Sequence, residues 1–250
     1  MRLVLKMRPE GNVLELPIDY RYIMQGILYG KIRDDGLVSF LHDQGYLNEG
    51  RAFKLFTFSQ LNGSYTIRRK TKRILFNGDI TWQISSVAVN FIQELGNGFL
   101  VGSPLTFNQQ LVHVTEMQCI PLQINKRKCH IKMLSPLTVH RTYETIDGKK
   151  RTHFITPYDP VFADMVFDNL RRKYEAYYQR KAMNDFRIHP VNVSKREKVV
   201  ARYKNNFFIT GYMGHYRLES DPELLTFAAA VGLGSRNSAG FGMFEIVEED

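Results

Sequence analysis

The sequence predicts an α+β protein built from two tandem ferredoxin-like (RRM-like) domains with a basic cleft between them. The order strand, helix, strands, helix, strand can be read twice along the 250 residues, with a polar seam after Pro121. The net charge is +9, from 34 Lys and Arg against 25 Asp and Glu, and basic clusters recur in both halves. Two adjacent sheets leave a cleft, and a basic cleft suits RNA.

The first predicted domain covers residues 1–122. An alternating strand over 3–7 comes first, and Pro17 and Asp19 then open a helix that runs to about Ile32. Its apolar stripe is expected to consist of Ile23, Ile27, Leu28 and Ile32. Tyr29 lies about 200° around the helix from Ile27, so we expect it to be exposed.

The rest of this domain is expected to be one short helix, several strands and a second long helix. The short helix covers 37–42, the strands cover 53–60, 65–68, 73–76 and 80–84, and turns fall at Asn62-Gly63 and Asn77-Gly78. The second long helix covers 87–95 and is closed by Gly96-Asn97-Gly98, and apolar runs follow at 99–101 and 111–114.

The second predicted domain covers residues 123–250 and repeats this order. The expected elements are a strand over 130–134, a hairpin over 139–154, a helix over 160–181, strands over 199–203 and 207–218, a helix over 221–231 and a strand over 241–247. The two halves show no strong sequence repeat, so the duplication rests on element order alone.

Composition limits location and cofactors. The N-terminal apolar run is only three residues long, too short for a signal peptide, and no stretch is long enough for a membrane helix, so we expect a cytoplasmic protein. Cys119 and Cys129 lack a companion pair at zinc spacing and are expected to be buried thiols. The seven histidines form no metal motif, so we expect neither a metal site nor a cofactor.

A glycine-rich run from Gly232 to Met243 is the most distinctive segment of the chain. Its spacing matches neither a dinucleotide fingerprint nor a Walker loop. Glycines permit positive φ and close backbone approach, so the run is expected to direct several N–H groups at a phosphate, or else to be a turn before the last strand. The expected RNA-binding residues are Gly232, Gly234, Ser235, Arg236, Asn237, Ser238, Gly240 and Gly242, extended by the basic residues Lys126, Arg127, Lys128, Lys195 and Arg196.

Five segments in a specific order carry a family resemblance: 25–31 (QGILYGK), 40–43 (FLHD), 53–59 (FKLFTFS), 134–139 (LSPLTV) and the glycine-rich run. With these segments the chain resembles the CRISPR-associated endoribonucleases that cut precursor CRISPR RNA within its repeats, members of the repeat-associated mysterious protein superfamily. The resemblance implies two ferredoxin-like domains and CRISPR repeat RNA as the partner. It leaves open whether the chain joins a CRISPR effector complex or forms a homodimer.

The resemblance also implies a catalytic set of Tyr29, His42 and Lys54, with an insertion-like segment, 44–51, that leaves the aim of Lys54 open. Metal-free cleavage by the 2′-hydroxyl leaves a 2′,3′-cyclic phosphate and a 5′-hydroxyl. It needs a proton acceptor, a proton donor and positive charge at the phosphate. A histidine is the natural acid or base and a lysine supplies the charge, while Tyr29 would orient the nucleophile or protonate the leaving group.

Two rival functions remain at this stage. Relatives in the same superfamily hold guide RNA as non-catalytic subunits of effector complexes, and a pure scaffold would not need the pair His42 and Lys54. A small-molecule enzyme that binds a nucleotide at the glycine-rich run is disfavoured by the glycine spacing and by the lack of an acidic ribose ligand in a βαβ unit.

Overall fold

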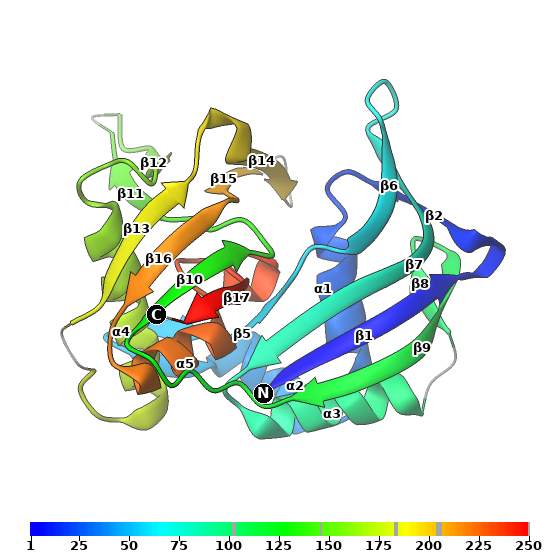
Figure 1. Cartoon of the computed structure of the whole chain (residues 1–250), viewed down its shortest axis with the longest axis horizontal. Coiled ribbons are helices and arrows are strands. Elements are labelled where there is room, and N and C mark those ends of the chain that lie inside the picture. Colours follow the sequence, from blue (N-terminus) through cyan, green and yellow to red (C-terminus); the bar gives the residue numbers. More distant parts are fainter. Residues whose placement is uncertain (102–103, 146, 183–184, 204–206, 250) are drawn as a thin grey trace.

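The computed structural model describes residues 1–101, 104–145, 147–182, 185–203 and 207–249. The fold is mixed α/β, with two main sheets packed side by side and joined by the extended segment after β9, residues 121–127 (Figure 1). No helix among these residues is long and apolar enough to cross a membrane.

The first sheet is built around one long strand, β7 (Arg73–Ser86). Two strands pair with one edge of β7, one after the other along its length: β1 (Arg2–Pro9) and β2 (Val13–Pro17). Two further strands pair with the other edge: β5 (Phe56–Phe58) and β6 (Asn62–Arg68). β9 (Gln110–Ile120) pairs with β1, and β8 (Leu105–Phe107) pairs with β9. All of these pairings are antiparallel.

Two helices, α1 (Arg21–Lys31) and α3 (Val89–Leu100), cover one face of this sheet. Leu28 and Ile32 of the expected stripe are buried, as is Met24, whereas Ile23 and Ile27 are only partly buried. The expected stop at Gly96-Asn97-Gly98 is wrong, because α3 continues to Leu100. A Cβ on Gly98 would lie 2.0 Å from the Lys31 carbonyl oxygen, so this glycine allows α1 and α3 to approach closely.

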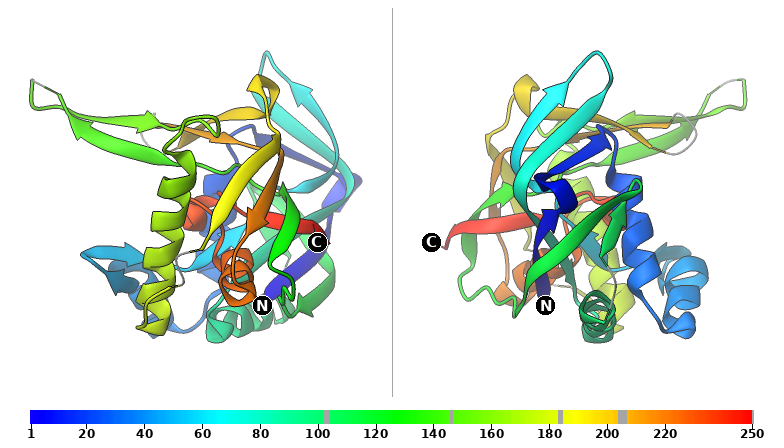
Figure 2. Two further views of the ribbon diagram at one scale, coloured as in Figure 1. Left: turned by 60° about the vertical axis from the view of Figure 1, so that its left-hand side comes forward. Right: turned by 90° about the vertical axis from the view of Figure 1, so that its right-hand side faces the viewer.

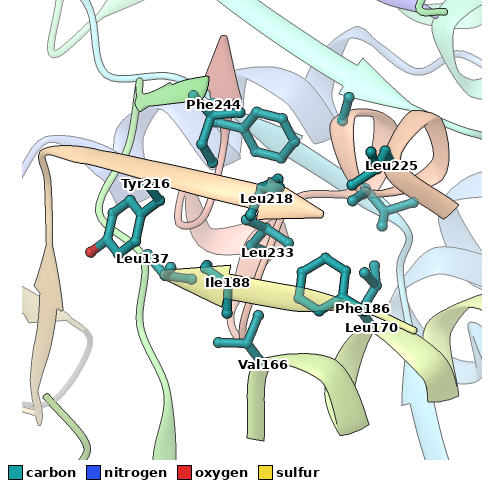
Figure 3. Packing of buried hydrophobic residues seen from close by; sticks show 14 of the residues in the cluster. Leu137, Val166, Leu170, Phe186, Ile188, Tyr216, Leu218, Leu225, Leu233 and Phe244 are labelled. Carbon is teal, nitrogen blue, oxygen red and sulfur yellow. The ribbon is translucent and has the colours of Figure 1, made fainter. Parts of the chain in front are cut away.

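The second sheet has the order β13-β16-β10-β17. Its strands are β10 (Lys128–Met133), β13 (Arg187–Asn192), β16 (His215–Glu219) and β17 (Phe244–Glu249). α4 (Phe162–Tyr178) and α5 (Pro222–Val231) pack beneath it, and Figure 3 shows Val166 and Leu170 of α4 directed at Ile188 and Phe186. The buried residues of this core are distinct from those of the first sheet's core. Leu55 of the first half belongs to it, and Tyr46, Phe53 and Val87 of the first half pack against it.

Three two-stranded sheets complete the described part of the chain. β3 (Tyr46–Asn48) pairs with β4 (Arg51–Phe53), β11 (His140–Glu144) with β12 (Lys150–Phe154), and β14 (Lys198–Tyr203) with β15 (Phe207–Tyr212). The β11–β12 hairpin extends away from the body of the molecule (Figure 2). Between α1 and β3 lie the short helix α2 (Asp35–Ser39) and a π-helical turn, Phe40–Gln44.

Several expected boundaries are wrong for identifiable reasons. The pieces 73–76 and 80–84 form one strand, because Asn77-Gly78 lies inside β7 instead of making a turn, and Asn62-Gly63 begins β6. The strand expected over 53–60 breaks between β4 and β5, and 207–218 is split between β15 and β16 at Gly214, where φ is +100°. β2 and β13 were missed because each contains a proline, and β13 is an edge strand that tolerates one.

Polar contacts tie the two halves together. The buried guanidinium of Arg2 donates to the Phe244 carbonyl at 2.7 Å, and the Thr57 hydroxyl donates to the Phe241 carbonyl at 2.9 Å. The Gln60 N–H donates to the Leu134 carbonyl at 2.9 Å. A site formed from both halves is therefore held by direct hydrogen bonds across the junction.

Candidate active site

Lys54 and Tyr29 lie in direct contact. The Lys54 Nζ donates a hydrogen bond to the Tyr29 hydroxyl at 3.2 Å and lies 5.5 Å from the centre of its ring. The two residues come from different elements, Tyr29 from α1 and Lys54 from the bend between β4 and β5. Two of the three expected catalytic residues are thus brought together by the fold.

The bend at Lys54 follows from the segment that precedes it. Residues 44–51 do not form a loose insertion, because they contain most of the β3–β4 hairpin, which packs on α4 and pairs Glu49 with Arg172 at 3.2 Å. Leu55 then adopts a positive φ of +51°, uncommon for a non-glycine residue, with its side chain buried in the second core. This reversal places Lys54 beside Tyr29.

Tyr29 is half-buried, so the expectation that it is exposed is wrong. Its ring packs edge-on against Phe56, with the centroids 6.2 Å apart. Burial, with a smaller effect from Tyr203, raises the pKa of the Tyr29 hydroxyl to about 12. The helical wheel failed because Phe56 of β5, a buried residue of the first core, packs against the Tyr29 ring. At neutral pH this hydroxyl is therefore protonated and is suited to donate.

His42 occupies a different setting. It lies on the π-helical turn Phe40–Gln44, with its side chain 74% exposed and its Nδ1 2.7 Å from the carboxylate of Asp43. Leu41 anchors the turn by burying its side chain in the first core. An exposed imidazole on this turn is accessible to a bound RNA.

The glycine-rich run is mostly buried, and its backbone donors are largely used inside the protein. The N–H groups of Gly232, Gly240 and Gly242 donate to the carbonyls of Ala228, Asn237 and Pro136. The expectation that these three N–H groups face an anion is therefore wrong. The glycines serve packing instead: φ is +82° at Gly240, and a Cβ there would lie 2.4 Å from the Phe58 ring.

Two buried polar side chains donate hydrogen bonds to backbone carbonyls of the run. The Asn237 amide, expected to contact RNA, is buried and donates to the carbonyls of Leu233 and Phe241, both at 3.0 Å. Lys173, which sequence reasoning missed, donates from α4 to the carbonyls of Gly232 at 3.0 Å and Gly234 at 2.7 Å. Burial lowers the pKa of Lys173 to about 7.

Only the middle of the run is directed outward. Ser235, Arg236 and Ser238 remain partly exposed, and the Arg236 guanidinium lies 4.8 Å from the centre of the Phe207 ring. Gln25 on α1 donates to the Ser238 carbonyl at 2.7 Å. The outward part of the run is therefore fixed against both α1 and the β14–β15 hairpin.

A cavity of about 240 Å³ joins these features. Its walls come from both halves of the chain, and it is lined by Ala52, Phe53, Lys54, Leu55, Phe56, Asn169, Lys173, Val231, Ser235, Arg236, Asn237 and Ser238. Lys54 therefore shares a concave surface with Ser235, Arg236 and Ser238. A phosphate held there would lie near the positive charges of both Lys54 and Arg236.

The two basic clusters predicted to extend the RNA contact lie elsewhere. Lys126, Arg127 and Lys128 adjoin the end of β16, where Arg127 pairs with Asp185 and the Lys128 ammonium lies 3.8 Å from the Glu219 carboxylate. Lys195 and Arg196 adjoin the start of β16, on an exposed turn. Opposite ends of β16 thus separate the clusters, and neither lines the cavity.

The remaining polar residues give no metal cluster within the described ranges, where no group of three or more His, Cys, Asp or Glu side chains is placed to hold an ion. Cys129 is buried as expected, but Cys119 is exposed at the end of β9, so that expectation is wrong for Cys119.

Comparison with known proteins decides the family. The family model described as CRISPR associated protein Cas6, C-terminal, matches residues 117–246, just over half of the chain. The chain belongs to the Cas6 family. It is 28% identical to the CRISPR-associated endoribonuclease Cas6 1 of Methanocaldococcus jannaschii, over 100% of this chain and 94% of that protein.

Two further Cas6 relatives match along nearly the whole chain. The CRISPR-associated endoribonuclease Cas6 of Pyrococcus furiosus is 24% identical over 98% of this chain and 90% of its own length. A solved structure titled CRISPR associated protein Cas6 superimposes with a TM-score of 0.80 at 27% identity and covers 99% of both chains. The similarity therefore includes both halves and the junction between them.

Proposed function

We propose that this Cas6 family member is a metal-independent endoribonuclease that cleaves precursor CRISPR RNA within its repeats. The observation that carries the proposal is the contact between Lys54 and Tyr29, which lies beside the outward part of the glycine-rich run in a cavity formed by both halves. The full-length similarity to proteins named CRISPR-associated endoribonucleases supports the substrate class.

The proposed reaction is an internal transesterification. The RNA 2′-oxygen loses its proton to His42 and forms a bond to phosphorus, while the bond between phosphorus and the 5′-oxygen breaks. Tyr29 donates a proton to the departing 5′-oxygen, a role supported by the hydrogen bond that its oxygen accepts from Lys54, since this leaves its own O–H free to donate. Lys54 stabilises the negative charge on the phosphoryl oxygens. The products are a 2′,3′-cyclic phosphate and a 5′-hydroxyl.

We further assign each half, 1–122 and 123–250, to a ferredoxin-like domain. The strand orders support this assignment, since β9-β1-β7-β5 and β17-β10-β16-β13 are the same order when the strands of each half are numbered along the chain. The residues proposed to contact RNA are Ser235, Arg236 and Ser238, with Lys126 to Lys128 and Lys195 to Arg196 as more distant electrostatic contacts.

The decisive experiment uses the purified chain in EDTA with a labelled CRISPR repeat RNA and a copy that carries 2′-deoxyribose at the cut position. We expect a single cut in the first RNA, none in the second, and a cyclic phosphate on the upstream product. Equal cutting of both RNAs would exclude attack by the 2′-hydroxyl. Tight binding of both RNAs without any cut would make the chain a non-catalytic RNA-binding subunit instead.

A further inference from the structure

A second, larger cavity adjoins the proposed catalytic cavity. It has a volume of about 760 Å³, within the usual range for ligand sites, and lies between β4, β11, α4 and the glycine-rich run. It is lined by Arg51, Val139, His140, Arg141, Thr142, Asp164, Met165, Asp168, Asn169, Gly234 and Ser235. Asn169 and Ser235 line both cavities, so a chain that leaves Lys54 can continue directly into this one.

In the part of the chain that the structure describes, the two arginines of this cavity are not held in ion pairs, although the carboxylates of Asp164 and Asp168 also line it. Within the described residues neither Arg51 nor Arg141 forms an ion pair, and Arg141 directs its Nε to the Met165 sulfur at 3.2 Å. The neighbouring α4 arginines contrast with them, because Arg171 and Arg172 are both paired with Asp168. Two unpaired guanidinium groups in a concave site favour a phosphate ligand.

Hydrogen bonds determine what His140 offers to a ligand. The Ser235 hydroxyl donates its one proton to the Thr138 carbonyl at 3.1 Å, so it must accept from His140 Nδ1 at 3.0 Å. Burial, together with the nearby Arg236 and Arg51, lowers the pKa of His140, which favours the neutral ring. A neutral ring with its proton on Nδ1 has Nε2 as a bare acceptor.

Asn169 and Asp164 add to this acceptor character. Within the described part of the chain the Asn169 Oδ1 is buried without a hydrogen-bond partner. An unpartnered buried amide oxygen is costly unless a ligand supplies a donor. The Asp164 carboxylate, exposed on the same side of α4, only accepts.

We propose that this cavity binds one unpaired nucleotide adjacent to the scissile phosphate and selects a base with an exocyclic amino group. Arg51 and Arg141 hold its phosphate, and His140, Asn169 and Asp164 accept hydrogen bonds from the exocyclic amino group of adenine, cytosine or guanine and, for guanine, from the ring N1–H. Uracil lacks the amino group and leaves an acceptor unpaired. This inference rests on the proposed function, since it takes RNA as the ligand.

The test replaces single bases and reads the effect by cleavage and by binding. In a repeat RNA, the nucleotide before the cut and the nucleotide after it are changed one at a time. Each is replaced by an analogue whose base lacks the exocyclic amino group: inosine for guanosine, purine riboside for adenosine, or zebularine for cytidine. We expect one position at which the analogue slows single-turnover cleavage about tenfold. No sensitive position in the wild-type chain would overturn the proposal.

Variants then assign the sensitivity to this cavity. His140→Ala and Asn169→Ala should reduce the tenfold discrimination to less than threefold, and Arg51→Ala should weaken RNA binding severalfold without changing base preference. Arg187→Ala, on the edge strand β13 and in neither cavity, removes the same charge as a control. Full discrimination in both His140→Ala and Asn169→Ala would place base recognition elsewhere and overturn the proposal.

A failure of the proposed function is distinguishable from a failure of this inference. If the wild-type chain cuts no RNA, the same analogue set is measured by equilibrium binding. A tenfold preference in affinity that His140→Ala removes would support the cavity as a nucleotide site in a non-catalytic protein. Equal affinities for all analogues would overturn it.

Discussion

The two parts of the candidate active site differ in how firmly the fold holds them. Lys54 and Tyr29 are in contact, partly buried, and lie in a cavity whose walls come from both halves. His42 is exposed on a π-helical turn, where its Nδ1 lies 2.7 Å from the Asp43 carboxylate. The proposed charge stabiliser and proton donor are therefore held in place before RNA binds, whereas the proposed base is exposed.

This difference has a local cause. Lys54 follows the β3–β4 hairpin, which packs on α4, and it precedes Leu55, which is buried in the second core. The chain is therefore held on both sides of Lys54. The turn that carries His42 has a single buried residue, Leu41. Phe40 of the same turn packs against that core and against Tyr46, but the His42 side chain itself is 74% exposed.

The largest effect on the cleavage rate is expected at His42, the exposed member of the site. His42→Ala should slow single-turnover RNA cleavage by about 10²–10⁴-fold, because the reaction loses its proton acceptor, while the RNA dissociation constant stays the same. His113→Ala, an exposed histidine on β9, is the matched control and should cleave normally. An unchanged rate for His42→Ala would remove His42 from the mechanism.

The next largest effect on the cleavage rate is expected at Lys54, which contacts Tyr29. Lys54→Met keeps the length of the side chain but removes the charge that faces the phosphate, and it should slow cleavage by about 10²–10³-fold. Lys54→Arg should recover part of the rate. Lys6→Met, which removes an exposed β1 lysine paired with Glu116, controls for the loss of one positive charge. A Lys54→Met rate within twofold of wild type would show that the preformed pair has no catalytic role.

A smaller effect is expected on the stability of the glycine-rich run, which lies beside Lys54 and Tyr29. Gly240→Ala forces a Cβ against the Phe58 ring at a φ of +82° and should lower the free energy of unfolding by about 2 kcal/mol. Gly96→Ala in α3 meets no atom within 4 Å and should be neutral or raise stability by about 0.5–1 kcal/mol. Urea unfolding of both variants checks this, and equal stabilities would mean that the run is not tightly packed.

The last effect is a gradual pH dependence from Lys173, which donates hydrogen bonds to carbonyls of the glycine-rich run. Its pKa is about 7 in the folded chain and 10.5 as the ordinary value, so between these limits the unfolded chain binds more protons. Stability should therefore rise with pH above 7, by at most about 1.4 kcal/mol per pH unit from this group. Urea unfolding at pH 7, 8 and 9 should show this slope in the wild type and a shallower one in Lys173→Met. Equal slopes would contradict a neutral buried lysine.

Much of the fold could be predicted from the sequence because its signals are local. The periodic helices α1, α4 and α5 and the hairpin β11–β12 lie close to the expected positions. The glycines show the limit of such signals. Gly98 and Gly240 look like breaks in a chain, yet each is required by an atom from a distant segment, the Lys31 carbonyl and the Phe58 ring.

The candidate site likewise combines features that sequence can predict with features that it cannot. The order of Tyr29, His42 and Lys54 along the chain was enough to name them through the family resemblance, but the half-burial of Tyr29 depends on β5, which no helical wheel includes. His140 and Asn169 could not be found from sequence. They are 29 positions apart, as their numbers show, and share a cavity only because β11 and α4 pack against the same glycine-rich run.

The claim that the two parts form one active site is tested most directly by a double-mutant cycle on the cleavage rate. Single-turnover rates are measured for wild type, His42→Ala, Lys54→Met and the double variant on one repeat RNA. If both groups act in the same transition state, the double variant should be little slower than the slower single variant. A loss equal to the product of the two separate losses would contradict a single site that unites the preorganised pair with the exposed histidine.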